Sequence, residues 1–236
     1  KICNDEIAVK ELPFLSRIDK MFWINNLTGW VLGHGHGLYK TVNGGDSWEK
    51  HENSDDISGD IFFLDSDLGW YFGKDEYFEL SQSGKVDKIK FFGDFPVVKR
   101  LQFTTPENGW LFDVINGKSR FQHTVDGGKT WNFVNIAGNE IDDFQFISEV
   151  DGFAISPKGL FGTSDNGQSW KLIRKQNKEK WINKIFFLDK NVGWIIGQNV
   201  CFTRDGGAAW ECTDFPNDLK NEFIKGFVFT DVNNGW

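Results

Sequence analysis

The sequence predicts an all-β protein, a β-propeller whose blades are four-stranded antiparallel sheets. Three observations predict this fold. A Gly-Trp dipeptide, once Gly-Phe, recurs about every 40 residues, an aromatic residue stands seven positions before each of those Trp or Phe residues, and a turn motif ending in Trp follows most of the pairs. Units that restart in the same phase at such a spacing are typical of propellers and other repeat folds.

The glycine–aromatic pairs follow one another at steps of 40, 40, 43, 41 and 42 residues. They are Gly29-Trp30, Gly69-Trp70, Gly109-Trp110, Gly152-Phe153, Gly193-Trp194 and Gly235-Trp236. The aromatic residues seven positions earlier are Trp23, Phe63, Phe103, Phe146, Phe187 and Phe229. Five full repeats and a partial sixth are therefore visible, and we expect six or seven blades in the intact protein.

Each repeat is expected to form four short strands. The first is an aromatic run such as 61–64 or 185–188, and the second opens at the glycine–aromatic pair. A third strand leads into a Thr, and the fourth begins at a Trp. Apolar runs of about four residues between Gly, Asn and Asp are typical of strands, and consecutive apolar residues in the first strand indicate that both of its faces are covered.

A β-sandwich is the alternative, because it also has short strands and frequent turns. A sandwich gives no reason for the same aromatic phase to return every 40 to 43 residues. A propeller blade of about 40 residues, packed between two neighbouring blades, does. We expect residues 1–236 to form one propeller domain that is truncated at its C-terminus, in which residues 1–15 supply an outer closing strand.

Four copies of a turn motif, which we call the motif turns, join the third and fourth strands. They are Thr41-Val-Asn43-Gly-Gly45-Asp-Ser-Trp48, Thr124-Val-Asp126-Gly-Gly128-Lys-Thr-Trp131, Thr163-Ser-Asp165-Asn-Gly167-Gln-Ser-Trp170 and Thr203-Arg-Asp205-Gly-Gly207-Ala-Ala-Trp210. The Asn or Asp is expected to accept hydrogen bonds from N–H groups of its own turn. The glycine supplies a backbone conformation that other residues adopt at a cost, and the Trp anchors the hairpin between strands.

These residues resemble the Asp-box (BNR) repeat propellers and, more narrowly, the family of photosystem II stability and assembly factor-like proteins. The resemblance covers residues 18–236. It implies a propeller that binds proteins or peptides and assists assembly at a membrane, rather than one that catalyses a reaction. It also implies export, to a periplasm or the cell surface. Because the motif marks a scaffold, a photosynthetic role does not follow from it.

Catalysis is the competing interpretation, because Asp-box propellers include sialidases and other glycoside hydrolases. A sialidase needs an arginine cluster for the substrate carboxylate and a tyrosine nucleophile. The chain has five arginines, one of them, Arg204, inside a motif turn, and three tyrosines. A sialidase-like triad is therefore not expected. The alternative function that remains is a carbohydrate-active propeller, either a hydrolase or a glycan-binding module.

Repetition also argues that the motif-turn carboxylates are structural rather than catalytic acids or calcium ligands. An active site needs dissimilar groups that converge on one point, whereas identical groups in successive blades point apart. We therefore expect no catalytic residue, no metal and no cofactor.

Three sets of residues are candidates for binding. His34 and His36 lie in a glycine-rich turn, where a metal site would need further donors nearby. Two blade-to-blade connectors differ in charge, one acidic and one basic, and could steer a protein partner or simply be solvated. The acidic set is Glu52, Asp55, Asp56 and Asp60, and the basic set is Lys171, Arg174, Lys175, Lys178 and Lys180.

Composition excludes some partners. The net charge is −8 and the sequence pI is about 5.1, whereas nucleic-acid binders normally have a basic footprint. No apolar run approaches the length of a membrane helix. Cys201 and Cys212 flank one hairpin symmetrically and should oppose each other across it, so they form either a disulfide or two buried thiols.

Overall fold

The fold is a β-propeller, formed by four-stranded antiparallel sheets, and every regular element in the described part of the chain is a strand. The computed structural model describes residues 17–51, 57–73, 76–80, 86–90, 97–136, 140–176, 182–215 and 231–232. The expected closing strand at residues 1–15 and the partial sixth repeat around Phe229 and Trp236 lie outside these residues.

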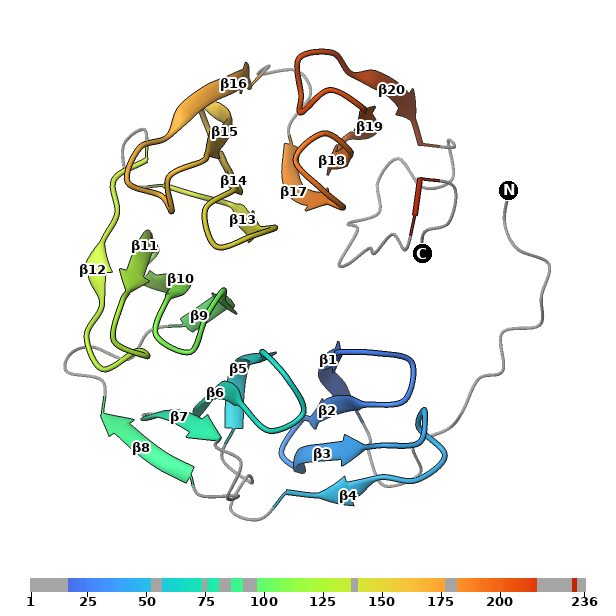
Figure 1. Ribbon diagram of the computed structural model, residues 1–236, viewed down its shortest axis with the longest axis vertical. Helices are drawn as coiled ribbons and strands as arrows, with labels where there is room; N and C mark the ends of the chain where they lie inside the picture. The colour runs from blue at the N-terminus through green and yellow to red at the C-terminus, as the bar shows by residue number, and fades with distance from the viewer. Residues whose placement is uncertain are drawn as a thin grey trace. The chain divides into compact units, whose positions relative to one another are not determined.

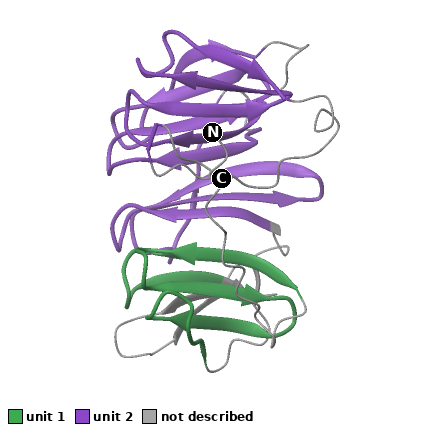
Figure 2. Ribbon diagram, turned by 90° about the vertical axis from the view of Figure 1, so that its right-hand side faces the viewer, with its two compact units in different colours: residues 1–95 green, residues 96–236 purple. Residues whose placement is uncertain are grey.

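The chain divides into two compact units, residues 1–95 and 96–236 (Figure 2). The first unit contains blades 1 and 2. Their strands are β1 Ile18–Trp23, β2 Gly29–Gly33, β3 Gly37–Thr41 and β4 Glu49–Lys50, then β5 Ile57–Phe63, β6 Gly69–Gly73, β7 Glu76–Leu80 and β8 Val86–Lys90.

The second unit contains blades 3, 4 and 5. Blade 3 consists of β9 Val97–Phe103, β10 Gly109–Ile115, β11 Lys118–Thr124 and β12 Asn132–Phe133. Blade 4 consists of β13 Asp143–Phe146, β14 Gly152–Ser156, β15 Gly159–Thr163 and β16 Lys171–Lys175, and blade 5 of β17 Ile182–Phe187, β18 Gly193–Gly197, β19 Asn199–Thr203 and β20 Glu211–Asp214. In every blade the strands pair in chain order (Figure 1).

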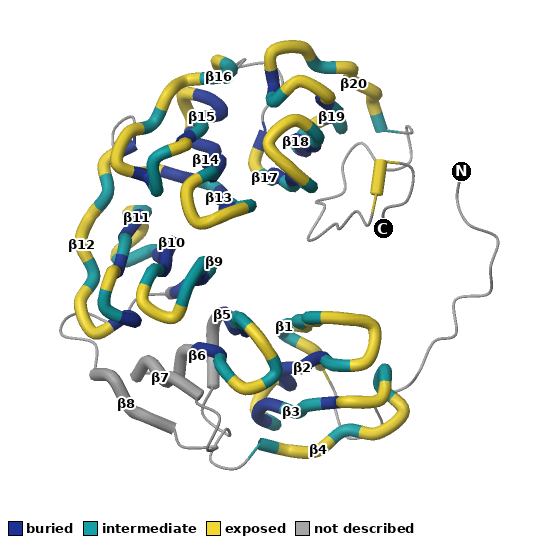
Figure 3. Tube along the Cα trace, viewed as in Figure 1, coloured by how far each residue is buried: buried dark blue, intermediate teal, exposed yellow. Residues whose placement is uncertain are grey.

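In blades 1, 3, 4 and 5, burial is concentrated in the second strand and falls toward the fourth (Figure 3). β2 and β14 are buried along their whole length, whereas every residue of β4 and β20 is exposed. The first strands of neighbouring blades contact one another within each unit, β1 with β5, and β9 and β17 with β13. The second strands, such as β2 and β14, are thus the ones covered on both faces. This corrects the expectation for the first strands, since β1 is exposed or only partly buried along its length.

The seven-residue aromatic spacing is set by the turn between the first and second strands. The first-strand aromatic residue pairs directly with the glycine, as in Phe103↔Gly109 and Phe187↔Gly193. Two residues after that aromatic residue, a side-chain oxygen accepts N–H groups of the turn. For example, Asp189 Oδ1 accepts from the N–H of Asn191 at 2.7 Å and of Val192 at 2.8 Å, as Asx residues do in turns. Asn25, Asp65, Thr105 and Ser148 occupy the same position in the other blades.

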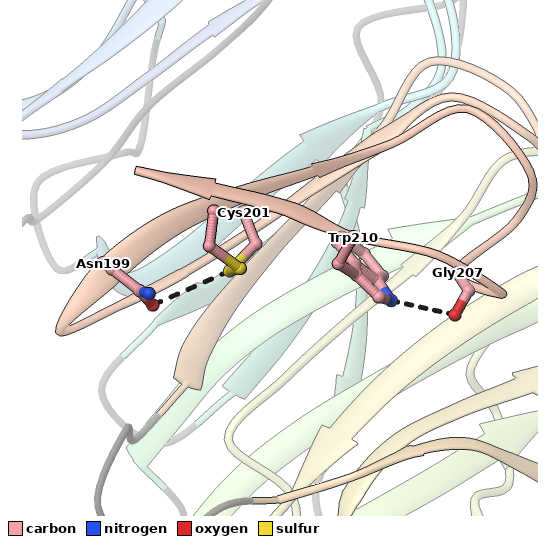
Figure 4. Close-up of a disulfide and its surroundings, with 5 residues drawn as sticks. Asn199, Cys201, Gly207 and Trp210 are labelled. Atoms are coloured by element: carbon pink, nitrogen blue, oxygen red, sulfur yellow. Dashed lines mark hydrogen bonds between the residues drawn. A yellow bond between two sulfur atoms is a disulfide. The ribbon is translucent and has the colours of Figure 1, made fainter. Parts of the chain in front are cut away.

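Cys201 and Cys212 oppose each other across β19 and β20 and form a disulfide, with Cα atoms 4.0 Å apart (Figure 4). The predicted register is thus confirmed, and the choice between a bridge and two thiols is resolved in favour of the bridge. Cys201 is 2% exposed, whereas Cys212 lies on the exposed outer strand. The disulfide therefore ties the edge of blade 5 to its interior.

Candidate functional site

The motif turns use their polar groups internally. In the blade 4 turn, Asp165 Oδ1 accepts from the Ser169 N–H at 2.9 Å and from the Thr163 hydroxyl at 2.7 Å, and Thr163 Oγ1 accepts from the Gly167 N–H at 2.9 Å. Asn43, Asp126 and Asp205 make the corresponding bonds. Hydrogen bonds from Ser169 lower the pKa of Asp165 to about 2. The expected turn chemistry is present, and it leaves these carboxylates as parts of the scaffold.

The motif-turn glycines have the expected backbone conformation, with φ between 69° and 93° at Gly45, Gly128, Gly167 and Gly207. The residue before each of them also has positive φ, and in blade 4 it is Asn166, with φ 55°. The Asn166 amide exchanges hydrogen bonds with the Asn108 amide of blade 3, at 3.0 and 3.3 Å. Asn166, which stands where the other motif turns have Gly, therefore links blade 4 to blade 3.

The tryptophans that end the motif turns are partly exposed, so they are buried less than expected. Trp131, Trp170 and Trp210 pack edge-on against the first-strand aromatic ring of their own blade, with centroids 6.0–6.4 Å apart. Trp48 packs in the same way on Trp23. Among the described tryptophans, those of the Gly-Trp pairs are the most buried, and Trp30, Trp70 and Trp110 are 0% exposed.

The two histidines lie in the turn between β2 and β3. His34 Nδ1 is 2.8 Å from Asp19 Oδ2, and the ring is largely exposed. Burial tends to raise the pKa of Asp19, but hydrogen bonds from His34 and Arg17 lower it overall. Within the described ranges, no three His, Cys, Asp or Glu side chains gather as metal ligands would.

The two charged connectors are placed differently from the expectation. Glu52, Asp55, Asp56, Lys178 and Lys180 lie outside the described residues. Asp60 was expected in the acidic connector, but it belongs to the first strand of blade 2, is 7% exposed and pairs with Lys20 at 3.1 Å. Lys171, Arg174 and Lys175 all lie on β16, the outer strand of blade 4.

The arginines are engaged separately. Arg100 pairs with Asp143 and Arg120 with Asp113, while Arg17 and Arg204 pair with Asp19 and Glu211. Arg174 turns toward blade 5, where its Cζ lies 5.4 Å from the centroid of the Trp210 ring, and burial lowers its pKa. Each described arginine thus has a carboxylate or an aromatic ring of its own.

No described strand pairs with the outer edge of β16; we call this side its open edge. Its register with β15 contains a bulge, and Leu172 opposes Phe161 while Lys175 opposes Gly159. The Gln176 N–H donates to Lys158 O at 2.9 Å, so these two residues form a hydrogen-bonded pair of the antiparallel ladder. Hydrogen-bonded and non-hydrogen-bonded pairs alternate along such a ladder, so the pairs formed by Leu172 and by Lys175 are non-hydrogen-bonded. The peptide groups of these two residues consequently point away from β15. Leu172 is also 44% exposed.

A cavity of about 340 Å³ lies beside this edge. Its wall on blade 4 is formed by Phe161, Gly167, Gln168 and Trp170, and its wall on blade 3 by residues 133–136. Phe161 and Ile136 are buried members of the core between these two blades. Because opposed residues of paired strands share a face, Leu172 lies on the same face of blade 4 as Phe161 and the cavity. The sequence identified the basic residues of β16 but gave no sign of this cavity.

No family model and no curated protein sequence matches this chain. Solved structures with the same fold do. One described as YCF48 bound to D1 peptide has a TM-score of 0.69 at 20% identity, over 96% of this chain and 77% of that one. YCF48 from Cyanidioschyzon merolae has a TM-score of 0.62 at 14% identity, over 90% and 76%. Virginiamycin B lyase from Staphylococcus aureus also has a TM-score of 0.62, at 8% identity, over 84% and 69%. These likenesses bear out the propeller fold.

Proposed function

We propose that this chain is a non-catalytic propeller, similar to the Asp-box and photosystem II assembly factor-like proteins, that binds an extended segment of a partner protein. The observation that supports it most directly is the open edge of β16 beside a cavity. An exposed strand edge is a common binding site for extended peptides, because the peptide gains main-chain hydrogen bonds and places alternate side chains in pockets.

Two further observations support this function. A propeller of the same fold has been solved with a peptide, as the description YCF48 bound to D1 peptide states. In addition, the repeated carboxylates of the motif turns are engaged within their turns and the described arginines have separate partners. The proposed role is therefore to hold a segment of a partner during assembly or stabilisation of a complex.

We also propose that the protein acts in an exported compartment. The Cys201–Cys212 disulfide supports this proposal, because disulfides persist in oxidising environments such as the periplasm and the cell surface. Among the described residues, no helix has the length and apolarity to cross a membrane.

A peptide-display selection on the purified chain tests the function. We expect enrichment of extended peptides, whose binding is lost in Gln168→Trp, because the indole would fill the mouth of the cavity that Gln168 lines. Gln198→Trp, at an exposed turn residue of blade 5, is the matched control and should bind normally. Turnover of glycosides, or micromolar binding on a glycan array without any enriched peptide, would favour the carbohydrate-active alternative instead.

A further inference from the structure

We infer that β16 receives an acidic, extended segment of a partner protein as a fifth strand of blade 4, and that a large side chain of this segment occupies the cavity beside Trp170. This inference rests on the proposed peptide-binding function, and it adds the place, the chemistry and the geometry of the bound segment.

β16 is one of the longer outer strands. β16 and β8 have five residues each, whereas β20 has four and β4 and β12 have two. Proteins commonly protect the edges of sheets by keeping edge strands short. Leu172 and Lys175 of β16 each direct a peptide N–H and C=O outward, so an added strand could form hydrogen bonds at both ends of β16.

The cavity opens on the face of blade 4 toward which alternate side chains of an added strand would point. Successive side chains of a strand alternate between the two faces of the sheet, and Leu172 already marks the face that Phe161 and the cavity occupy. A volume of about 340 Å³ is at the small end of ligand sites. Phe161, Ile136 and Trp170 line it together with the polar residues Asn135 and Gln168, so the lining is mixed. Its size suits one large side chain of an extended segment.

Charge selects an acidic segment. Residues 166–176 include Lys171, Arg174 and Lys175 and no Asp or Glu, although the whole chain has a net charge of −8. The blade 3 wall of the cavity, residues 133–136, carries no carboxylate. The corresponding outer strand of blade 5, β20, has Glu211 and Asp214 instead. An acidic segment is therefore attracted to β16 and repelled by β20.

Lysines on a strand edge can also serve to prevent pairing between sheets. Charge reversal distinguishes protection from recognition. A protective lysine disfavours any added strand, whereas a lysine that recognises the partner favours an acidic strand. Lys171 and Lys175 are both exposed, and replacing them should leave the core intact.

The probes are three synthetic nine-residue peptides with a central Phe flanked by Val at alternate positions, and with Glu, Gln or Lys at all remaining positions. Fluorescence anisotropy is measured with the intact chain at low and high salt. We expect the Glu peptide to bind most tightly and to weaken with salt. Lys171→Glu/Lys175→Glu should weaken it about tenfold and strengthen the Lys peptide, as two reversed charge pairs allow.

Lys118→Glu/Lys190→Glu is the matched control, since both lysines are exposed and lie outside β16; it should change the affinity less than about twofold. Leu172→Pro tests strand addition. The Leu172 N–H points outward, so proline removes no bond of the β15–β16 ladder, and binding should be lost while the near-UV circular dichroism spectrum is retained.

Different outcomes would overturn this inference and the proposed peptide-binding function. If display-selected peptides bind the chain but both the charge reversal and Leu172→Pro leave their affinity unchanged, β16 is not the site and this inference is overturned. If no peptide is selected and none of the three probes binds, the proposed function itself fails.

Discussion

Single residues explain why glycine precedes the aromatic residue in each repeat. The first-strand ring lies across the glycine that it pairs with, and a Cβ built on Gly109 would lie 2.5 Å from Cε1 of Phe103. The first-strand aromatic ring of the same blade lies in the same position beside Gly29, Gly69, Gly152 and Gly193. None of these five glycines has positive φ, so the requirement for glycine comes from space rather than from backbone conformation.

Gly109→Ala should therefore lower the free energy of unfolding by about 1–3 kcal/mol, the usual cost of overpacking a core. Urea denaturation measures this loss. In the double variant Gly109→Ala/Phe103→Leu, the smaller Leu side chain leaves room for the methyl group of Ala. The stability loss of the double variant should therefore be smaller than the sum of the losses of the two single variants. Strict additivity would mean that the ring and the glycine do not compete for the same space.

At the scale of the element, backbone hydrogen bonds in blades 1, 3, 4 and 5 join the motif turn to the turn between the first and second strands. The motif turn donates a backbone N–H to the turn between the first and second strands, as from Gly127 to Glu107 O at 2.9 Å and from Gly206 to Asn191 O at 2.9 Å. These bonds hold the two kinds of turn side by side at one end of the blade. Blade 5 adds the disulfide between β19 and β20 to this common plan.

Removal of the disulfide in Cys201→Ser/Cys212→Ser should cost about 3 kcal/mol of stability, the loop-entropy value for a separation of 11 residues. The bridge itself is checked by thiol titration of the denatured chain. One reactive thiol, that of Cys3, is expected without reductant and three with it. Three thiols without reductant would show that the bridge is absent.

At the scale of the whole molecule, stacked rings join successive blades. Trp30 of blade 1 stacks on Phe63 of blade 2 with centroids 3.8 Å apart, and Phe153 of blade 4 stacks on Phe187 of blade 5 at 3.6 Å. Trp110 stacks on Phe146 in the same way, at 4.4 Å. Side-chain amides add to this link. Gln145 accepts from the Phe187 N–H at 2.7 Å and donates to its carbonyl oxygen at 3.0 Å, and Gln102 does the same with Phe146.

This packing predicts a pH dependence of stability. His123 stacks on Trp110 at 4.0 Å, its Nε2 is 2.5 Å from Asn108 Oδ1, and burial lowers its pKa. The unfolded chain takes up the proton near pH 6.5, whereas the folded chain does so only at lower pH. Stability should therefore be independent of this group above about pH 6.5 and fall as the pH drops below it.

Unfolding free energies measured between pH 7.5 and 5.5 check this expectation. His123→Gln should be less stable at pH 7.5, because the ring stack is lost, but should have a flatter pH dependence. An equally steep decline in the variant would assign the pH dependence to other groups.

The sequence by itself determined the strands, their order within a blade and the turns, because these depend on contacts between residues close along the chain. The offset from Phe103 to Trp110 and the register of Cys201 with Cys212 are both set by a single hairpin. Only the tertiary structure decided which tryptophans are most buried, that Asp60 pairs with Lys20, and that Arg174 faces blade 5 while a cavity opens beside Leu172. These features depend on how one sheet packs against the next, and residues about 40 positions apart meet there without a local pattern that records the contact.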